Sequence, residues 1–409
     1  MYEYGVGQLT RHLWAHFPFV HALPFDWLAF LVLLVAGTCV LLFIMFLGIV
    51  AVWAERKVAG HIQDRLGPMR AGWHGWLQTV ADGVKLMLKE ETLHSGVDRV
   101  LFYLAPCLAF QAPFLAFLVL PFSSRAQMAD LDVGVLFITA IGGLSVVAII
   151  MAGLASNSKW PLYGAMRSAA LVVSYGVPLT LSLIPALMLA GSLSMQDIVH
   201  SQTGSLLNWN LFRAWPFMPA AFLIFFIAVL AETNRVPFDI AEAESELVGG
   251  YHTEYSGIMW SIFFMGEYSA MFLSCGVATT LFLGGFLPPH LGALGCLGIP
   301  RFLAWLGVVL FLLWRFRTFR ERRQIAEAVF FALLTLFCLA VWAIWPHLFW
   351  FLLKTTLLFN VMLLLRWTLP RLRIDQMMHM CWKVLIPAAF INVLGTGLYW
   401  LWTYSACVR

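Results

Sequence analysis

Long runs of apolar residues dominate this chain and leave few folds open to it. Ten runs can be read as membrane-crossing helices: residues 27–53, 101–122, 134–155, 169–190, 216–231, 257–282, 301–314, 325–346, 348–365 and 384–404. A helix of roughly 18 or more apolar residues can cross a hydrocarbon layer. Hydrophobic residues make up 61% of the chain and charged residues 11%, which excludes a soluble globular protein. The predicted fold class is all-α, a polytopic bundle of about ten transmembrane helices.

The basic residues indicate how this bundle is oriented. If the loop after the first span is cytoplasmic and the spans alternate, 19 of the 25 Lys and Arg residues lie on the inner side. Cytoplasmic loops of membrane proteins carry such an excess. We therefore expect a bacterial inner-membrane protein with both termini on the periplasmic side. The net charge of +4 follows from this topology, so no nucleic-acid partner is expected.

Residues from about 73 to 91 carry an amphipathic pattern on the inner side. The apolar positions recur at helical spacing, and they are Trp73, Trp76, Leu77, Val80, Val84, Met87 and Leu88. The other face is lined by His74, Gln78, Asp82, Lys85 and Lys89. A helix of this kind lies in the membrane interface rather than crossing it. It can serve as a lipid anchor or as one wall of a crevice that is open to lipid and to the cytoplasm.

The inner loop Ala231–Ser256 concentrates carboxylates. With one residue of the following span, it holds seven of the chain's 21 acidic residues: Glu232, Asp239, Glu242, Glu244, Glu246, Glu254 and Glu267. Asp239 is placed to cap a short helix that Gly249-Gly250 would end, with Asp239, Glu242 and Glu246 on one face. Like charges at this spacing repel, which raises their affinity for protons.

Two interpretations of this loop remain. It can be a capped helix with a solvated acidic face, or a group of carboxylates that handle protons. Glu232 and Glu267 lie at or inside spans, where an ionised side chain costs roughly 2.5–3.5 kcal/mol on insertion scales. That cost has no structural explanation in the sequence, so proton handling is the hypothesis for these two residues.

The ordered motifs of this inner side resemble one family of NADH-quinone oxidoreductase (respiratory complex I) components, the membrane protein designated H in bacteria and subunit 1 in mitochondria. The main matches are Ala231–Asp239, Ala241–Leu247 and Thr253–Gly257. Supporting matches are Glu55–Lys57, Arg65–Pro68, Ala81–Lys85, Lys89–Glu90, Ser156–Lys159, Gly266–Tyr268, Leu353–Thr355, Leu369–Arg371 and Asp375–Met377. The resemblance covers about residues 27–285 and 347–400.

The resemblance implies roles for individual residues. The family belongs to the NADH:quinone translocase, forms the quinone-access cavity, begins the proton path and anchors the peripheral redox arm; the isolated chain is not expected to catalyse. The implied quinone-site residues are Trp53, Glu55, Arg56, Arg65, Asp82, Arg235 and Phe238. The implied proton-path residues are Glu232, Asp239, Glu242, Glu246, Glu254 and Glu267.

The resemblance also implies partners and a substrate. Other complex I subunits are expected as partners, namely the peripheral quinone-reducing arm and small membrane subunits, together with lipid and with quinone (ubiquinone or a relative) as substrate. The seven cysteines are scattered and show no spacing typical of a metal or cluster site. No iron–sulfur cluster, flavin or metal is therefore expected on this chain.

Two departures from the family pattern affect these expectations. Family members usually carry a glutamate after the tyrosine of the fourth span, but here Gly176 follows Tyr175. Residues 287–346 are additional to the usual eight spans and are expected to form an inserted helical hairpin. The expected organisation is a membrane domain over 1–286, the hairpin over 287–346 and two further spans of the same domain over 347–409.

Three other functions remain open on the sequence. One is the homologous anchor subunit of a membrane-bound hydrogenase or ferredoxin-linked complex. A stand-alone ion carrier is disfavoured because no inverted internal repeat is visible. A purely structural anchor gains support from the missing carboxylate at Gly176.

Overall fold

The computed structural model describes residues 25–124, 126–239, 248–289 and 346–408. In this part of the chain 7 helices are long and apolar enough to cross a membrane, and no strand is present. They are α2 (Phe25–Ile62), α4 (Arg99–Val119), α5 (Gly134–Ala155), α6 (Lys159–Ala190), α10 (Gly257–Phe282), α13 (Pro346–Thr368) and a final run made of α14 (Ile374–Met380), η6 (Cys381–Leu385) and α15 (Ile386–Val408). The shorter apolar helix α8 covers Phe217–Glu232. The predicted all-α transmembrane bundle is confirmed.

The predicted spans 301–314 and 325–346 and the expected hairpin over 287–346 fall almost wholly outside the described residues. Helix α13 begins directly after this segment, at Pro346. Proline suits the first turn of a helix because its missing N–H would have no partner there.

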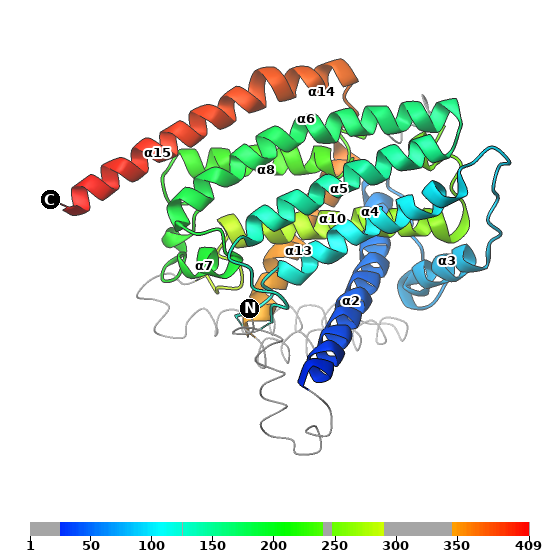
Figure 1. Ribbon diagram of the computed structural model, residues 1–409, viewed down its shortest axis with the longest axis horizontal. Helices are drawn as coiled ribbons and strands as arrows, with labels where there is room; N and C mark the ends of the chain where they lie inside the picture. Colours follow the sequence, from blue (N-terminus) through cyan, green and yellow to red (C-terminus); the bar gives the residue numbers. More distant parts are fainter. Residues whose placement is uncertain (1–24, 125, 240–247, 290–345, 409) are drawn as a thin grey trace.

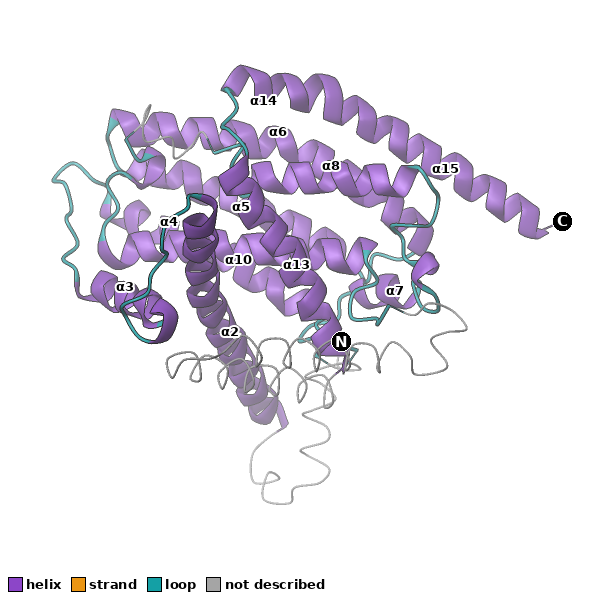
Figure 2. Ribbon diagram, turned by 180° about the vertical axis from the view of Figure 1, so that it is seen from behind, coloured by secondary structure: helices purple, strands orange, loops and turns teal. Residues whose placement is uncertain are grey.

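The helices form one bundle in which α4, α5, α6, α8 and α10 run side by side (Figure 1). The last helix, α15, packs along α6 and α8. On the other side of α10 lie α2 and α13, with the short helix α3 (Leu77–Leu88) beside α2, as Figure 2 also shows from behind. Helix α10 therefore touches both halves of the bundle.

Three helices are longer than their apolar runs. Helix α2 continues past residue 53 to Ile62, so Glu55 lies inside it rather than at a membrane boundary. Helix α6 begins at Lys159 instead of residue 169, with Pro161 in the first turn, where proline is tolerated. The final run begins at Ile374 instead of residue 384. Hydropathy underestimates such helices because charged residues lower the average without breaking the backbone hydrogen bonds.

The predicted amphipathic helix forms in part. A short 3-10 turn, η2 (Trp73–Gly75), precedes α3. Gly75 has a positive φ of 75°, and a Cβ there would lie 2.1 Å from the carbonyl oxygen of Pro68. Only glycine permits this close approach, which folds the loop after α2 against the start of α3.

Connecting loops meet at one end of the bundle, which we call the polar end: residues 63–76, 89–98, 156–158, 233–256 and 369–373. Backbone hydrogen bonds join them there. The amide of Asp98 donates to the carbonyl of Ala155 at 3.2 Å, and the amide of Leu372 donates to the carbonyl of Pro237 at 3.0 Å. The loops therefore hold side chains from distant parts of the sequence in fixed relative positions.

Candidate functional site

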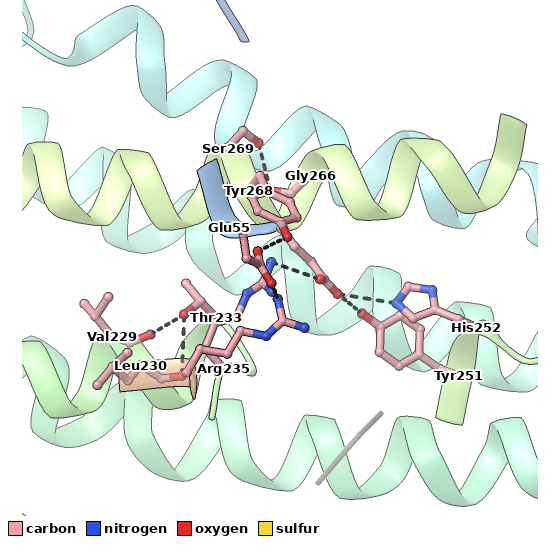
Figure 3. Close-up of polar contacts among 12 residues, drawn as sticks. Glu55, Val229, Leu230, Thr233, Arg235, Tyr251, His252, Gly266, Tyr268 and Ser269 are labelled. Carbon is pink, nitrogen blue, oxygen red and sulfur yellow. Dashed lines mark hydrogen bonds and ion pairs between the residues drawn. The ribbon is translucent and has the colours of Figure 1, made fainter. Parts of the chain in front are cut away.

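Glu267 is the centre of one cluster at the polar end. Its Oε1 accepts a hydrogen bond from the Tyr251 hydroxyl at 2.9 Å and lies 3.4 Å from Nε2 of His252. Its Oε2 lies 3.7 Å from Nη2 of Arg235. Figure 3 shows Tyr251 and His252 beside this part of α10, with Arg235 approaching from another side. The carboxylate thus has both a cation and neutral donors around it.

Glu55 is the centre of a second cluster. Its side chain bonds to the Tyr268 hydroxyl from α10 and to the Arg366 guanidinium from α13. Glu55 is only 6% exposed, so its charge is removed from water and depends on these two partners. One carboxylate therefore ties three helices together.

Arg235 joins the two clusters. Its guanidinium lies 4.4 Å from the centre of the Tyr268 ring and 3.7 Å from the Glu267 carboxylate. A cation over an aromatic face is attracted electrostatically, and more strongly when both are buried. Arg235 is 3% exposed. The buried ionisable groups consequently form one continuous row across α10.

The end of α8 determines where Arg235 lies. Thr233 turns its hydroxyl back to the Val229 carbonyl at 2.9 Å, and the Arg235 amide donates to the Leu230 carbonyl at 3.1 Å. Asn234 has a positive φ of 49°, a conformation that asparagine tolerates better than most residues. The Ser168 hydroxyl donates to its Oδ1 at 3.2 Å, which fixes this turn against α6.

Glu232 faces a cavity of about 120 Å³ between α4, α5, α6, α8 and α10. The cavity is mostly apolar, and its polar lining includes Thr139, Ser145, Glu232, Asn234, Tyr251, Glu267 and Ser274. A Cβ on Gly142 would lie 3.2 Å from Oε1 of Glu232, so glycine leaves room for the carboxylate. A volume of this size admits several water molecules, since one needs only about 10–15 Å³ of such space.

Asp239 and Phe238 lie at the start of the acidic loop. Asp239 pairs with Arg371 at 3.1 Å. The ring of Phe238 lies 5.2 Å from that of Tyr175, whose hydroxyl donates to the Met377 carbonyl at 2.9 Å. These contacts attach the acidic loop to α6 and to the final helical run.

A separate surface lies where α2 meets α3. The Trp53 indole N–H donates to the His74 carbonyl at 3.2 Å, and Arg56 pairs with Asp82 at 2.6 Å. The outward apolar side chains of α3 are all more than a third exposed, and they are Leu77, Val80, Val84, Met87 and Leu88. A helix that presents apolar side chains outward suits contact with lipid or a hydrophobic ligand.

The remaining predicted site residues are less well connected. Arg65 is exposed, and its Nε donates to Gln63 at 2.6 Å. Glu254 is half-buried in the loop before α10. Glu242 and Glu246, with the helix predicted to carry them, fall outside the described residues. The structure thus joins Glu55, Arg235 and Glu267 in one row, with Glu232 across the cavity, and leaves Arg65 apart from them.

Tyr255 anchors the loop that carries Glu254. Its hydroxyl donates to the Phe102 carbonyl at 3.3 Å, and the two rings stack at 4.0 Å. Burial raises the pKa of Tyr255, so the phenol remains a hydrogen-bond donor. The loop is therefore held on an apolar base beneath its charged residues.

Four members of the site were not predicted from the sequence: Tyr251, His252, Tyr268 and Arg366. Tyr268 belongs to the Gly266–Tyr268 motif, and His252 lies between two of the matching motifs, so a local signal existed for both. Arg366 counted only as an orientation signal. Its partner Glu55 is 311 positions away, and no local pattern indicates such a pair.

Comparisons with known proteins agree with this arrangement. The family model described as NADH dehydrogenase matches residues 35–397. An H-type NADH-quinone oxidoreductase subunit of Solibacter usitatus is 41% identical over 366 residues, which cover 86% of this chain and 92% of that protein. The H-type protein of Chlorobaculum tepidum is 42% identical over 85% of this chain and 86% of its own length. A third, from Cytophaga hutchinsonii, is 38% identical over 89% of this chain and 98% of its own length. The chain therefore belongs to the NADH dehydrogenase family, together with these H-type NADH-quinone oxidoreductase proteins.

Proposed function

We propose that this chain is the membrane subunit of a proton-translocating NADH–quinone oxidoreductase. The observation that carries the proposal is the row of buried ionisable groups at one end of a transmembrane bundle, directly beside a cavity that holds Glu232 and Glu267. Buried carboxylates in membrane spans are costly and are typical of proton-handling proteins. Oxidoreductase activity belongs to the assembled complex, and the isolated chain does not catalyse.

Quinone reaches the complex between α2 and α3 in this proposal. The exposed apolar side chains of α3 suit the isoprenoid tail, while Arg56, Asp82 and the buried Glu55 offer polar groups beyond it. Arg235 and Phe238 lie deeper at the same end of the bundle and line the route to the acidic loop. Arg65, although exposed, lies at the rim of this route.

Protons follow the carboxylates in this proposal. Reduction of a quinone takes up protons, and the acidic loop with Asp239, Glu242, Glu246 and Glu254 supplies groups that can hold them. Glu267 and Glu232 continue the route into the bundle, because both line the same cavity. Low dielectric surroundings disfavour the charged carboxylate, so each can change its protonation when a neighbour changes its charge.

The polar end faces the cytoplasm of a bacterial cell in this proposal, and both termini are periplasmic. The same end receives the peripheral redox arm, which carries the iron–sulfur clusters and flavin. Small membrane subunits and lipid cover the remaining sides of the bundle.

Purification of the complex from native membranes in mild detergent tests the proposal. The expected result is recovery of the chain with the NADH-oxidising arm, with quinone reduction that depends on NADH. Recovery with nickel–iron hydrogenase subunits would favour the hydrogenase-anchor alternative instead. Recovery of the chain alone, with ion transport in vesicles, would show a stand-alone carrier.

A further inference from the structure

His252 lies between the acidic loop and Glu267. It ends the 3-10 turn η4 (Gly250–His252), which packs against α5 and α6, and its side chain is 9% exposed. Its ring lies 3.8 Å from that of Tyr251 and 5.1 Å from that of Phe263. This packing holds Nε2 of the imidazole toward Oε1 of Glu267 at 3.4 Å.

The cavity is on the other side of Glu267. Glu267 and Tyr251 both line it, whereas His252 does not. A group that reaches Glu267 from the loop through His252 therefore arrives at a carboxylate that opens onto the cavity.

We infer that His252 carries protons between the acidic loop and Glu267. This inference rests on the proposed function and adds to it a residue that accepts protons on one edge of its ring and releases them from the other. Imidazole is suited to the task because it gains and loses a proton near neutral pH and has two separate nitrogens.

The transfer balances without a co-reactant. Imidazolium gives the proton on Nε2 to Oε1 of Glu267, and the products are a neutral imidazole and a neutral carboxyl group. The carboxyl passes its proton to water in the cavity and becomes a carboxylate again. The imidazole regains a proton through Nδ1 from the side of the loop.

The groups around His252 keep the other charges constant. Arg235 stays cationic beside Oε2 of Glu267, and the Tyr251 hydroxyl donates to Oε1 at 2.9 Å in both states. The described residues of α5 and α6 in this packing are apolar, among them Ile149, Ala152 and Ala165. Glu267 is consequently the acceptor that faces Nε2.

His252→Asn in the complete, membrane-embedded complex tests the inference. Asparagine can still hydrogen-bond Glu267 but cannot carry a proton. Proton translocation per quinone reduced, divided by the amount of assembled complex, should fall several-fold, and the pH profile of turnover should flatten on one limb. His347→Asn is the matched control, since His347 is a partly buried histidine that contacts Phe286 at the opposite end of the bundle.

His252→Ala with added imidazole provides a second measurement that does not depend on the asparagine side chain. Recovery of proton translocation by imidazole supports the inference. An unchanged translocation ratio and pH profile in both variants would overturn it. If Glu267→Gln lowers the ratio while both His252 variants keep it, His252 alone is excluded as a carrier; if neither position matters, the proposed proton path itself fails.

Discussion

Glu267 and Tyr268 are neighbours in α10, yet their side chains serve two different clusters. The Tyr268 hydroxyl bonds to Glu55 on α2, whereas the Glu267 carboxylate accepts from Tyr251 at 2.9 Å. Successive residues of a helix point about 100° apart, so one helical step is enough to reach both sides of α10. A displacement of this helix would alter both clusters together.

Replacing Glu232 with Gln should weaken proton translocation. The amide keeps the size of the side chain but cannot take a proton, and loss of one positioned proton-transfer group typically costs roughly 100-fold in rate. Because water in the cavity can carry part of the flow, we expect the ratio of protons translocated to quinone reduced to fall several-fold. Glu90→Gln, at an exposed position of the polar end, is the control. An unchanged ratio for Glu232→Gln would remove this residue from the path.

Replacing Arg366 with Leu should destabilise the assembled complex. Removal of one partner of a buried ion pair costs roughly 3–5 kcal/mol, because the other charge is left unpaired. The double variant Arg366→Leu with Glu55→Gln should recover part of the loss. The amount of complex that survives heating, measured on native gels, reports the effect. For comparison, the pair Arg56–Asp82 is much more exposed, and Arg56→Leu should cost about 0–1 kcal/mol; equal losses for both arginines would contradict the buried-pair explanation.

Substitutions of Gly176 should be tolerated. A Cβ at this position meets no described atom within 4 Å, and alanine in a helix is more stable than glycine by about 0.5–1 kcal/mol. Both Gly176→Ala and Gly176→Glu should therefore assemble and reduce quinone. Gly164→Ala on the same helix is the contrasting variant, since its Cβ would lie 2.7 Å from Cα of Gly250 and should impair assembly. Failure of Gly176→Ala to assemble would mean that a partner subunit fills this space.

Replacing Val84 with Asn should hinder quinones with long tails. Val84 belongs to the exposed apolar side of α3 and is 50% exposed. Loss of partial burial of such a side chain is worth about 1 kcal/mol, or roughly fivefold in KM. The KM for a long-tailed quinone should rise while that for a tailless analogue stays constant. Leu207→Asn, an exposed leucine near the opposite end, controls for general effects on the membrane surface; equal changes for both quinones would argue against α3 as the entrance.

Asp130, in the loop between α4 and α5, should make stability depend on pH. Burial, and then the nearby charge of Asp197, raise the pKa of its carboxyl above the ordinary value of 3.8. The stability associated with the neutral form is present below 3.8 and is lost as pH rises through the raised value. Asp130→Asn should therefore increase heat resistance of the complex at neutral pH and leave it unchanged in acid. A variant that is stabilised equally at both pH values would point to a cause other than ionisation.

Apolar length alone located most of the helices. The predicted spans 134–155 and 257–282 coincide with α5 and α10, because neither run contains a strong helix breaker and both are bounded by polar turns. Charged stretches hid the true start of α6 and the true end of α2. A hydropathy average responds to charge, whereas a helix responds to the continuity of its backbone hydrogen bonds.

The candidate site divides along a similar line. The carboxylates were recognisable from their local concentration in the loop, and Glu232 and Glu267 from their unusual position in spans. Their partners were not, because Arg366 reaches Glu55 across 311 residues and His252 reaches Glu267 through a turn that no local pattern specifies. Pairing of this kind is decided by tertiary packing.

The length of α8 has an electrical consequence. Its 16 residues span about 24 Å, which is shorter than a hydrocarbon layer of roughly 30 Å. With its other end at the membrane surface, α8 places Glu232 about 6 Å below the opposite surface, roughly a fifth of the way through the layer. A proton that binds there has already crossed the same fraction of the transmembrane voltage. Each ~100 mV would then shift the free energy of proton binding at Glu232 by about 0.5 kcal/mol, which makes its occupancy sensitive to the energised state of the membrane.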